Sequence, residues 1–113
     1  MSDSSALKSA RIRELNDQLR RDHVGGRIVV TPGIDALGTE AMCSVLAAVA
    51  AFDNFNEDCD PWGEHDCASL TVAGRRVLFK IDYFDTQLEF HSSDASDPAV
   101  TQRVMTVMLA EEY

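Results

Sequence analysis

The residues best suited to chemistry are found where an acidic stretch runs into a predicted β-hairpin. Glu64, His65 and Asp66 place a histidine between two carboxylates, and such neighbours can poise a base for proton transfer. Antiparallel pairing of the hairpin would bring three residues of the next strand to the same end, namely Asp82, Tyr83 and Asp85. A metal-dependent or acid–base hydrolase would use Glu64, His65, Asp66 and Asp82. The competing interpretation is that these side chains close the turn at the end of the sheet by hydrogen bonding.

Metal binding is a second chemistry open to this stretch. Asp58, Asp60 and Gly63 match the first, third and sixth positions of a calcium loop, but Trp62 and Ser69 occupy two positions that need oxygen ligands. An EF-hand is therefore excluded, while an irregular site for a hard cation remains open. Zinc ligands could come from Cys59, His65, Cys67 and either Cys43 or His91, without the usual zinc spacing. We expect no cofactor.

Charge points to a third possibility, a protein-binding surface. The formal net charge is −9, and all of it belongs to residues 53–113. Residues 53–66 hold six carboxylates and no Lys or Arg, and such a cluster must be solvated, bound to a cation or held against a basic partner. We expect Trp62 to be exposed as an anchor. The predicted partner-binding residues are Asp53, Glu57, Asp58, Asp60, Trp62, Glu64, Asp82 and Asp85.

Three helices are predicted to position these residues. From Ala6 to about His23, the spacing of Leu7, Ile12, Leu15 and Leu19 predicts an amphipathic helix, with Arg20 among the charges of its outer face. Residues 39–52 or 39–55 form an apolar helix that we expect to be central and buried, with Cys43 inside. The pair Asp97 and Pro98 predicts the start of a last helix, running to about residue 111.

The predicted strands are short. Residues 27–31 are β-branched and end at a Pro-Gly pair. Residues 65–72 and 76–83 flank a turn that contains Gly74, and residues 87–91 continue the meander. The order is therefore α-β-α-β-β-β-α, which predicts an α+β domain with helices packed on one face of an antiparallel sheet.

Size and composition limit the function classes. A chain of 113 residues forms one domain, 1–113, with residues 1–5 as a flexible lead. Its longest apolar run is too short to span a bilayer, and its first residues do not resemble a signal peptide, so we expect a cytoplasmic protein. A pI near 4.5 argues against direct binding to nucleic acid or to anionic membranes.

Several blocks of sequence together resemble a small family of alphaproteobacterial domains of unknown function, often found on plasmids and other mobile elements. The resemblance covers about residues 11–113, and no activity or catalytic residue comes with it. Its blocks are Arg11-Ile-Arg-x-Leu-Asn-Asp17, Phe52-Asp-x-Phe55, Asp60-Pro-x-Gly-Glu-His-Asp66, Lys80-Ile-Asp-Tyr83 with Asp85, Asp97-Pro98, and Arg103-Val-x-Thr-Val-Met-Leu-Ala-Glu-Glu-Tyr113. The setting implies an accessory or counter-defence role, such as inhibition of a host nuclease or a CRISPR complex.

The leading hypothesis is a small acidic, non-catalytic protein that engages a basic, nucleic-acid-binding surface of a host protein. Carboxylates arranged along one side can occupy a groove built for the phosphate backbone, as an inhibitor of the anti-CRISPR or anti-restriction type would. The alternative is the hydrolase built on Glu64, His65 and Asp66.

Overall fold

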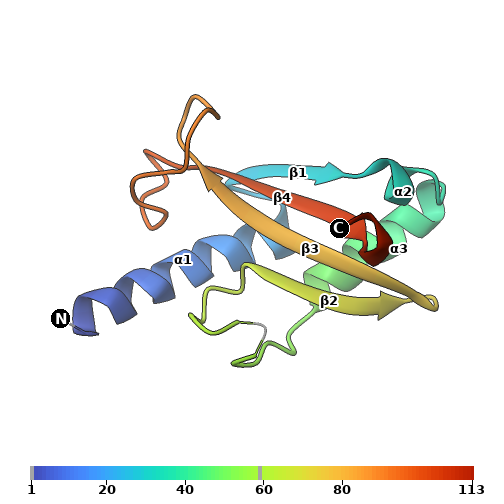
Figure 1. Cartoon of the computed structure of the whole chain (residues 1–113), viewed down its shortest axis with the longest axis horizontal. Helices are drawn as coiled ribbons and strands as arrows, with labels where there is room; N and C mark the ends of the chain where they lie inside the picture. Colours follow the sequence, from blue (N-terminus) through green and yellow to red (C-terminus); the bar gives the residue numbers. More distant parts are fainter. Residues whose placement is uncertain (1, 59) are drawn as a thin grey trace.

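The computed structural model describes residues 2–58 and 60–113. It contains a four-stranded mixed sheet and three α-helices, so the predicted α+β class is confirmed (Figure 1). The helices are α1 (Ser2–Asp22), α2 (Pro32–Asp35) and α3 (Thr39–Ala51), and a 3₁₀ turn, η1, covers Ala110–Glu112. The strands are β1 (Gly26–Val30), β2 (Cys67–Val72), β3 (Arg75–Phe84) and β4 (Gln102–Leu109).

The sheet order is β1-β4-β3-β2, and only β1 and β4 are parallel. The antiparallel strands β2, β3 and β4 form the meander, with β4 in place of the strand predicted at residues 87–91. That segment instead turns back on itself and keeps one bridge, between Phe84 and His91. The predicted hairpin is confirmed: Val72 pairs with Arg75 across a two-residue turn.

The helix predicted from Pro98 is wrong, because residues 102–109 form the central strand β4. Asp97 does act as a local cap, and its carboxylate accepts the N–H of Ala99 at 2.9 Å, but this closes a turn and not a helix. From Arg103 to Leu109, every second side chain of β4 faces the interior. Pairing with β1 and β3 stabilises this strand more than the cap at Asp97 and Pro98 could stabilise a helix.

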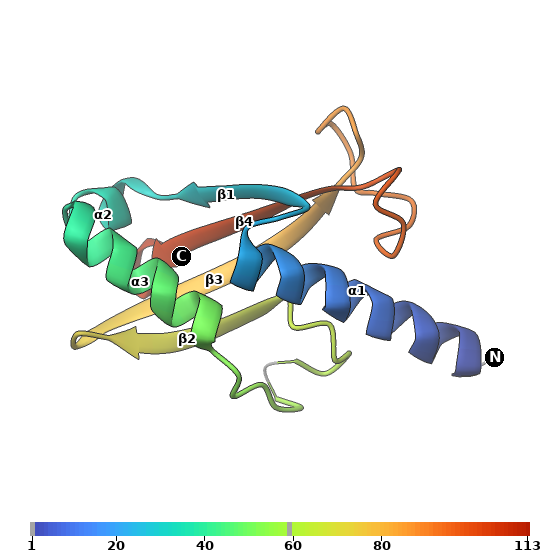
Figure 2. The ribbon, with the colours of Figure 1, turned by 180° about the vertical axis from the view of Figure 1, so that it is seen from behind.

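Helices α1 and α3 cover one face of the sheet (Figure 2). Leu19, Val45 and Val49 pack in the core with residues such as Phe79 and Met105. The helix α3 is not central as predicted. It presents Cys43 and other small residues to solvent, because Ala, Ser and Cys need no burial on its outer side. The other face of the sheet is turned towards the viewer in Figure 1, and of the described helical elements it carries only the short turn η1.

The first half of α1 extends past the edge of the sheet (Figures 1 and 2). Leu7 is accordingly 72% exposed, although the spacing predicted a core position, whereas Ile12, Leu15 and Leu19 are buried. None of the described helices combines the length and apolar character needed to cross a membrane.

Candidate functional site

Residues 53–66, which we name the acidic loop, connect α3 to β2. Asp53, Glu57 and Asp58 are exposed in this loop. Trp62 is 77% exposed, which confirms the prediction for this side chain. The acidic loop therefore presents a large aromatic ring and several carboxylates on the same segment.

Asp60 differs from its neighbours because it is buried. Its Oδ1 accepts the backbone N–H groups of Glu64 and His65 at 3.0 and 3.1 Å, and its Oδ2 also lies 3.1 Å from the His65 nitrogen. The carboxylate thus closes the turn that leads into β2. A partner protein cannot reach it directly, so Asp60 is removed from the predicted binding surface.

His65 ties the acidic loop to helix α1. Its Nδ1 lies 2.9 Å from an oxygen of Asp17, and its Nε2 lies 3.7 Å from Asp60. The imidazole also stacks on the ring of Phe55, with centroids 3.9 Å apart. Burial raises the pKa of Asp17, but hydrogen bonds and positive charge from His65 and Arg20 outweigh that effect and hold the pKa below its ordinary 3.8.

Arg20 is buried at the centre of this arrangement, and its prediction as an outer-face residue is wrong. Its Nη1 donates to the carbonyl groups of Val49 and Ala50 in the last turn of α3 and of Phe52 just after it, at 2.9, 3.0 and 2.7 Å. Its Nη2 donates to Asp17 at 2.9 Å. Because a helix end leaves carbonyl groups without intrahelical partners, Arg20 caps α3 from the side and joins it to α1.

A second buried network holds Glu64. The Tyr83 hydroxyl donates to Glu64 Oε1 at 2.9 Å and accepts from Asn16 Nδ2 at 2.8 Å. Asn16 also donates to the Glu64 carbonyl at 3.0 Å and accepts from Arg103 Nε at 2.9 Å. Burial raises the pKa of Tyr83 far above its ordinary value, so this phenol stays protonated and acts as a hydrogen-bond donor.

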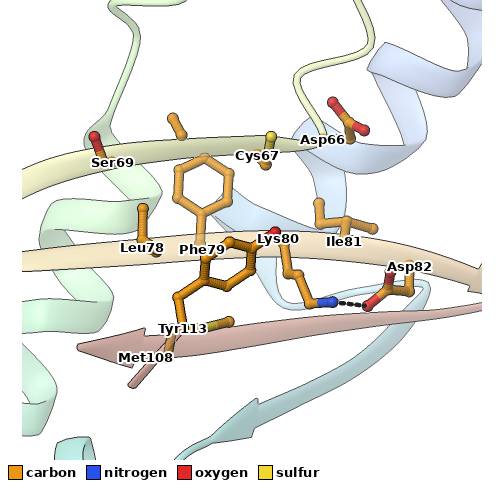
Figure 3. Close-up of a pocket in the computed structure, with 11 residues that line it drawn as sticks. Asp66, Cys67, Ser69, Leu78, Phe79, Lys80, Ile81, Asp82, Met108 and Tyr113 are labelled. Carbon is orange, nitrogen blue, oxygen red and sulfur yellow. Dashed lines mark ion pairs between the residues drawn. The ribbon is translucent and has the colours of Figure 1, made fainter. Parts of the chain in front are cut away.

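Asp66 and Asp82 lie elsewhere, along a groove on the open face of the sheet (Figure 3). We name this depression of about 490 Å³ the sheet groove; it is lined by residues that include Asp66, Ser69, Leu78, Asp82, Met108 and Tyr113. Lys80 Nζ lies 3.4 Å from Asp82. Burial raises the pKa of Asp66, and the charges of Glu64, Asp60 and Asp82 add to the effect.

The hairpin pairing therefore brings only some of the predicted groups together. Glu64 meets Tyr83, as the pairing predicts, and His65 packs towards α1 on the helix side. Asp66 and Asp82 line the groove on the opposite face. Asp85 caps a separate turn, where its Oδ1 accepts the N–H groups of residues 87 and 89 at 3.1 and 3.0 Å.

Metal ligands do not gather in the part of the chain that the structure describes. Residues 2–58 and 60–113 contain no group of three or more His, Cys, Asp or Glu side chains placed to hold an ion. The predicted zinc ligand Cys59 lies outside these residues. Cys43 is exposed on α3, and Cys67 lines the sheet groove on β2.

Three polar residues that shape the site were not singled out from the sequence: Asn16, Arg20 and Arg103. The spacing of Ile12, Asn16 and Arg20 offered a signal, because positions four apart share one face of a helix. Ile12 is buried, and Asn16 and Arg20, which share its face of α1, are buried with it. Arg103 gives no such signal, because the sequence predicts a helix from residue 98 to about residue 111.

No curated protein and no solved structure matches the chain. A family model does match it, over residues 30–112, and this range includes the acidic loop, the hairpin and the sheet groove but not α1. The chain belongs to the DUF3768 family, whose members are described as proteins of unknown function.

Proposed function

We propose that this chain is a non-catalytic acidic binding protein whose acidic loop docks on a basic surface of a nucleic-acid-processing protein. The observation that carries the proposal is Trp62, a large aromatic ring 77% exposed on the same loop as three exposed carboxylates, Asp53, Glu57 and Asp58. A tryptophan side chain can bury roughly 150–250 Å² on binding. Aromatic anchors of this kind dominate the energy of many interfaces, while charges around them guide a partner of opposite sign.

Residues 60–65 of the loop, which include Trp62, are held in place before any partner arrives. Asp60 closes its turn, His65 binds Asp17, and Arg13 Nη1 donates to the Gly63 carbonyl at 3.0 Å. A segment that is already ordered loses less conformational entropy on binding, so more of the interaction energy remains as affinity. These contacts favour a binding surface over a loosely solvated loop.

The partner class follows from charge. The acidic loop exposes the carboxylates of Asp53, Glu57 and Asp58 and has no Lys or Arg, so its natural counterpart is a surface rich in arginine and lysine. Grooves that bind the phosphate backbone have this composition, and a row of carboxylates can occupy them in place of nucleic acid. The resemblance to mobile-element proteins favours a counter-defence inhibitor of a host nuclease or CRISPR complex, acting in the cytoplasm.

No observation favours the hydrolase built on Glu64, His65, Asp66 and Asp82. A general base and its partner groups must converge on one reacting atom. Here Glu64 and His65 are engaged by Tyr83 and Asp17, whereas Asp66 and Asp82 line the other face of the sheet.

The test compares two triple variants of equal charge change. A partner captured from the source cells is purified, and its affinity is measured for D53N/E57Q/D58N and for D35N/E40Q/E111Q, whose exposed carboxylates lie around α2, the start of α3 and η1. We expect the loop variant to lose about tenfold or more in affinity, since each neutralised contact removes a charged interaction. Binding should also weaken with added salt, and W62A should lose affinity. Equal affinity of the two triple variants for the partner would refute the proposal.

A further inference from the structure

The sheet groove has the apolar floor of a binding site. Leu78 and Met108 come from neighbouring strands, and their registry places them directly opposite each other on the open face. Tyr113, 84% exposed, lines the same groove (Figure 3). Its volume of about 490 Å³ lies in the range of sites that enclose a small ligand or a long side chain.

One end of the groove is anionic. Among the described residues, no cationic side chain pairs with the carboxylate of Asp66, and Glu64, Asp60 and Asp82 all add negative charge near it. Asp82 is paired with Lys80, but both side chains are more than 40% exposed, at 41% and 43%. An exposed pair of this kind is weak, so Lys80 can be displaced at little cost.

An alkyl stem that ends in a delocalised cation fits this combination of surfaces. The methylene groups of an arginine would cover the half-buried Leu78, next to the buried Met108, and the guanidinium would reach towards the carboxylates of Asp66 and Asp82. The ring of Tyr113 adds an aromatic wall, on which guanidinium groups stack more readily than ammonium groups do. The groove therefore favours arginine over lysine.

The strand beside the groove offers a way to deliver such a side chain. Strand β2 is at the edge of the sheet. The Ile81 N–H donates to the Asp66 carbonyl at 2.7 Å. In an antiparallel pair, every second residue directs its N–H and C=O groups to the neighbouring strand, and the residues between direct theirs away from it. The peptide groups of Ser69 and Thr71 therefore point away from β3, to the outer edge of the sheet. An added strand would lie about 4.8 Å away, and its alternate side chains would cover the open face.

We propose that the sheet groove binds an arginine side chain carried by an extended segment that pairs with the outer edge of β2. The proposal rests on the proposed function, because it gives the same basic partner a second contact. The acidic loop would attract the partner over a broad surface. The groove would bind one arginine side chain, and the outer edge of β2 would bind the backbone of the same segment.

The probe for this site is a capped pentapeptide, acetyl-Thr-Val-Arg-Val-Thr-amide, titrated into the ¹⁵N-labelled full chain. We expect shifts of backbone amide signals at Ser69, Leu78 and Asp82. The same peptide with neutral citrulline in place of arginine should bind about tenfold more weakly, since it loses the charge-assisted hydrogen bonds. A lysine peptide should fall between the two. Equal affinities for arginine and citrulline, or shifts confined to residues 53–58, would overturn the proposal.

Variants sharpen the assignment. D66N/D82N should weaken the arginine peptide about tenfold, while K80Q should strengthen its binding, because the internal competitor for Asp82 is removed. E89Q is the matched control: Glu89 is exposed in the turn after β3, and neutralising it should change nothing. An unchanged affinity in D66N/D82N would contradict the groove as the site, and a loss of affinity in K80Q would contradict the competition.

The purified partner separates this inference from the proposed function. A loss of affinity in both D53N/E57Q/D58N and D66N/D82N supports both. If only D53N/E57Q/D58N loses affinity for the partner, the proposed function stands and the role of the groove in partner binding is overturned. If only D66N/D82N loses affinity for the partner, the groove stands as a binding site and the role of the acidic loop in partner binding is overturned.

Discussion

Replacing Arg20 with methionine tests whether this buried guanidinium holds the two main helices together. The change removes the donors that serve three carbonyl groups at the end of α3, and it removes the bond to Asp17. Removing one partner from a buried ionic contact costs about 3–5 kcal/mol, because the groups left behind stay buried without partners. Methionine keeps much of the apolar contact, so the loss measures hydrogen bonding and charge more than packing. Small domains have total stabilities of about 5–15 kcal/mol, so R20M should be strongly destabilised.

The measurement is urea unfolding followed by far-UV circular dichroism at neutral pH. The matched control is R21M, because Arg21 is the next residue of α1 and is exposed, and its loss should change stability by less than about 0.5 kcal/mol. The buried Nε of Arg20 has no hydrogen-bond partner among the described residues, which lowers the net contribution of this side chain to stability. If R20M unfolds at the same urea concentration as R21M, the assignment of Arg20 as the link between α1 and α3 is wrong.

Three further predictions concern single side chains. Asp17 has a lowered pKa in the folded state, so it contributes stability that is present above about pH 4 and is lost as the pH falls further; urea midpoints of D17N should lack this acid dependence. Asp66 has a raised pKa, so its ionisation costs stability as the pH rises above 3.8; D66N should have a higher midpoint than the wild type at about pH 7 but not at about pH 3, and equal gains at both would contradict the assigned cause. Ala73 has a φ of 51° in the hairpin turn; A73N should raise the stability by about 0.5–1 kcal/mol in thermal melts, because asparagine tolerates this conformation better.

Local patterns in the sequence predicted the elements whose residues respond mainly to local forces. The hairpin of β2 and β3 was signalled by alternation on both sides of a Gly-containing turn, and β1 by its β-branched run. Strand β4 was missed because Asp97 and Pro98 carry a helix-start signal, while the forces that make the segment a strand come from β1 and β3. The four-residue α2 is too short to leave a periodic pattern.

The candidate site was predictable to a similar degree. The exposure of Trp62 follows from its position beside proline in a polar segment. The burial of Asp60 does not, since it depends on a turn that directs two N–H groups at one carboxylate. The different surroundings of His65 and Asp66 do not follow from strand alternation either, because both residues precede β2 and His65 has a φ of 56°.

The pairing of β1 with β4 joins residues 77 positions apart, such as Gly26 and Arg103. Bringing such distant segments together costs loop-closure entropy and slows folding, whereas the hairpin of β2 and β3 can form locally. During synthesis, β1 and β3 therefore cannot pair with β4 until residues 102–109 have left the ribosome. A chain that ends before Gln102 would leave unpaired the edges of β1 and β3 that normally bond to β4. A β-prone peptide added separately should be able to pair with these edges.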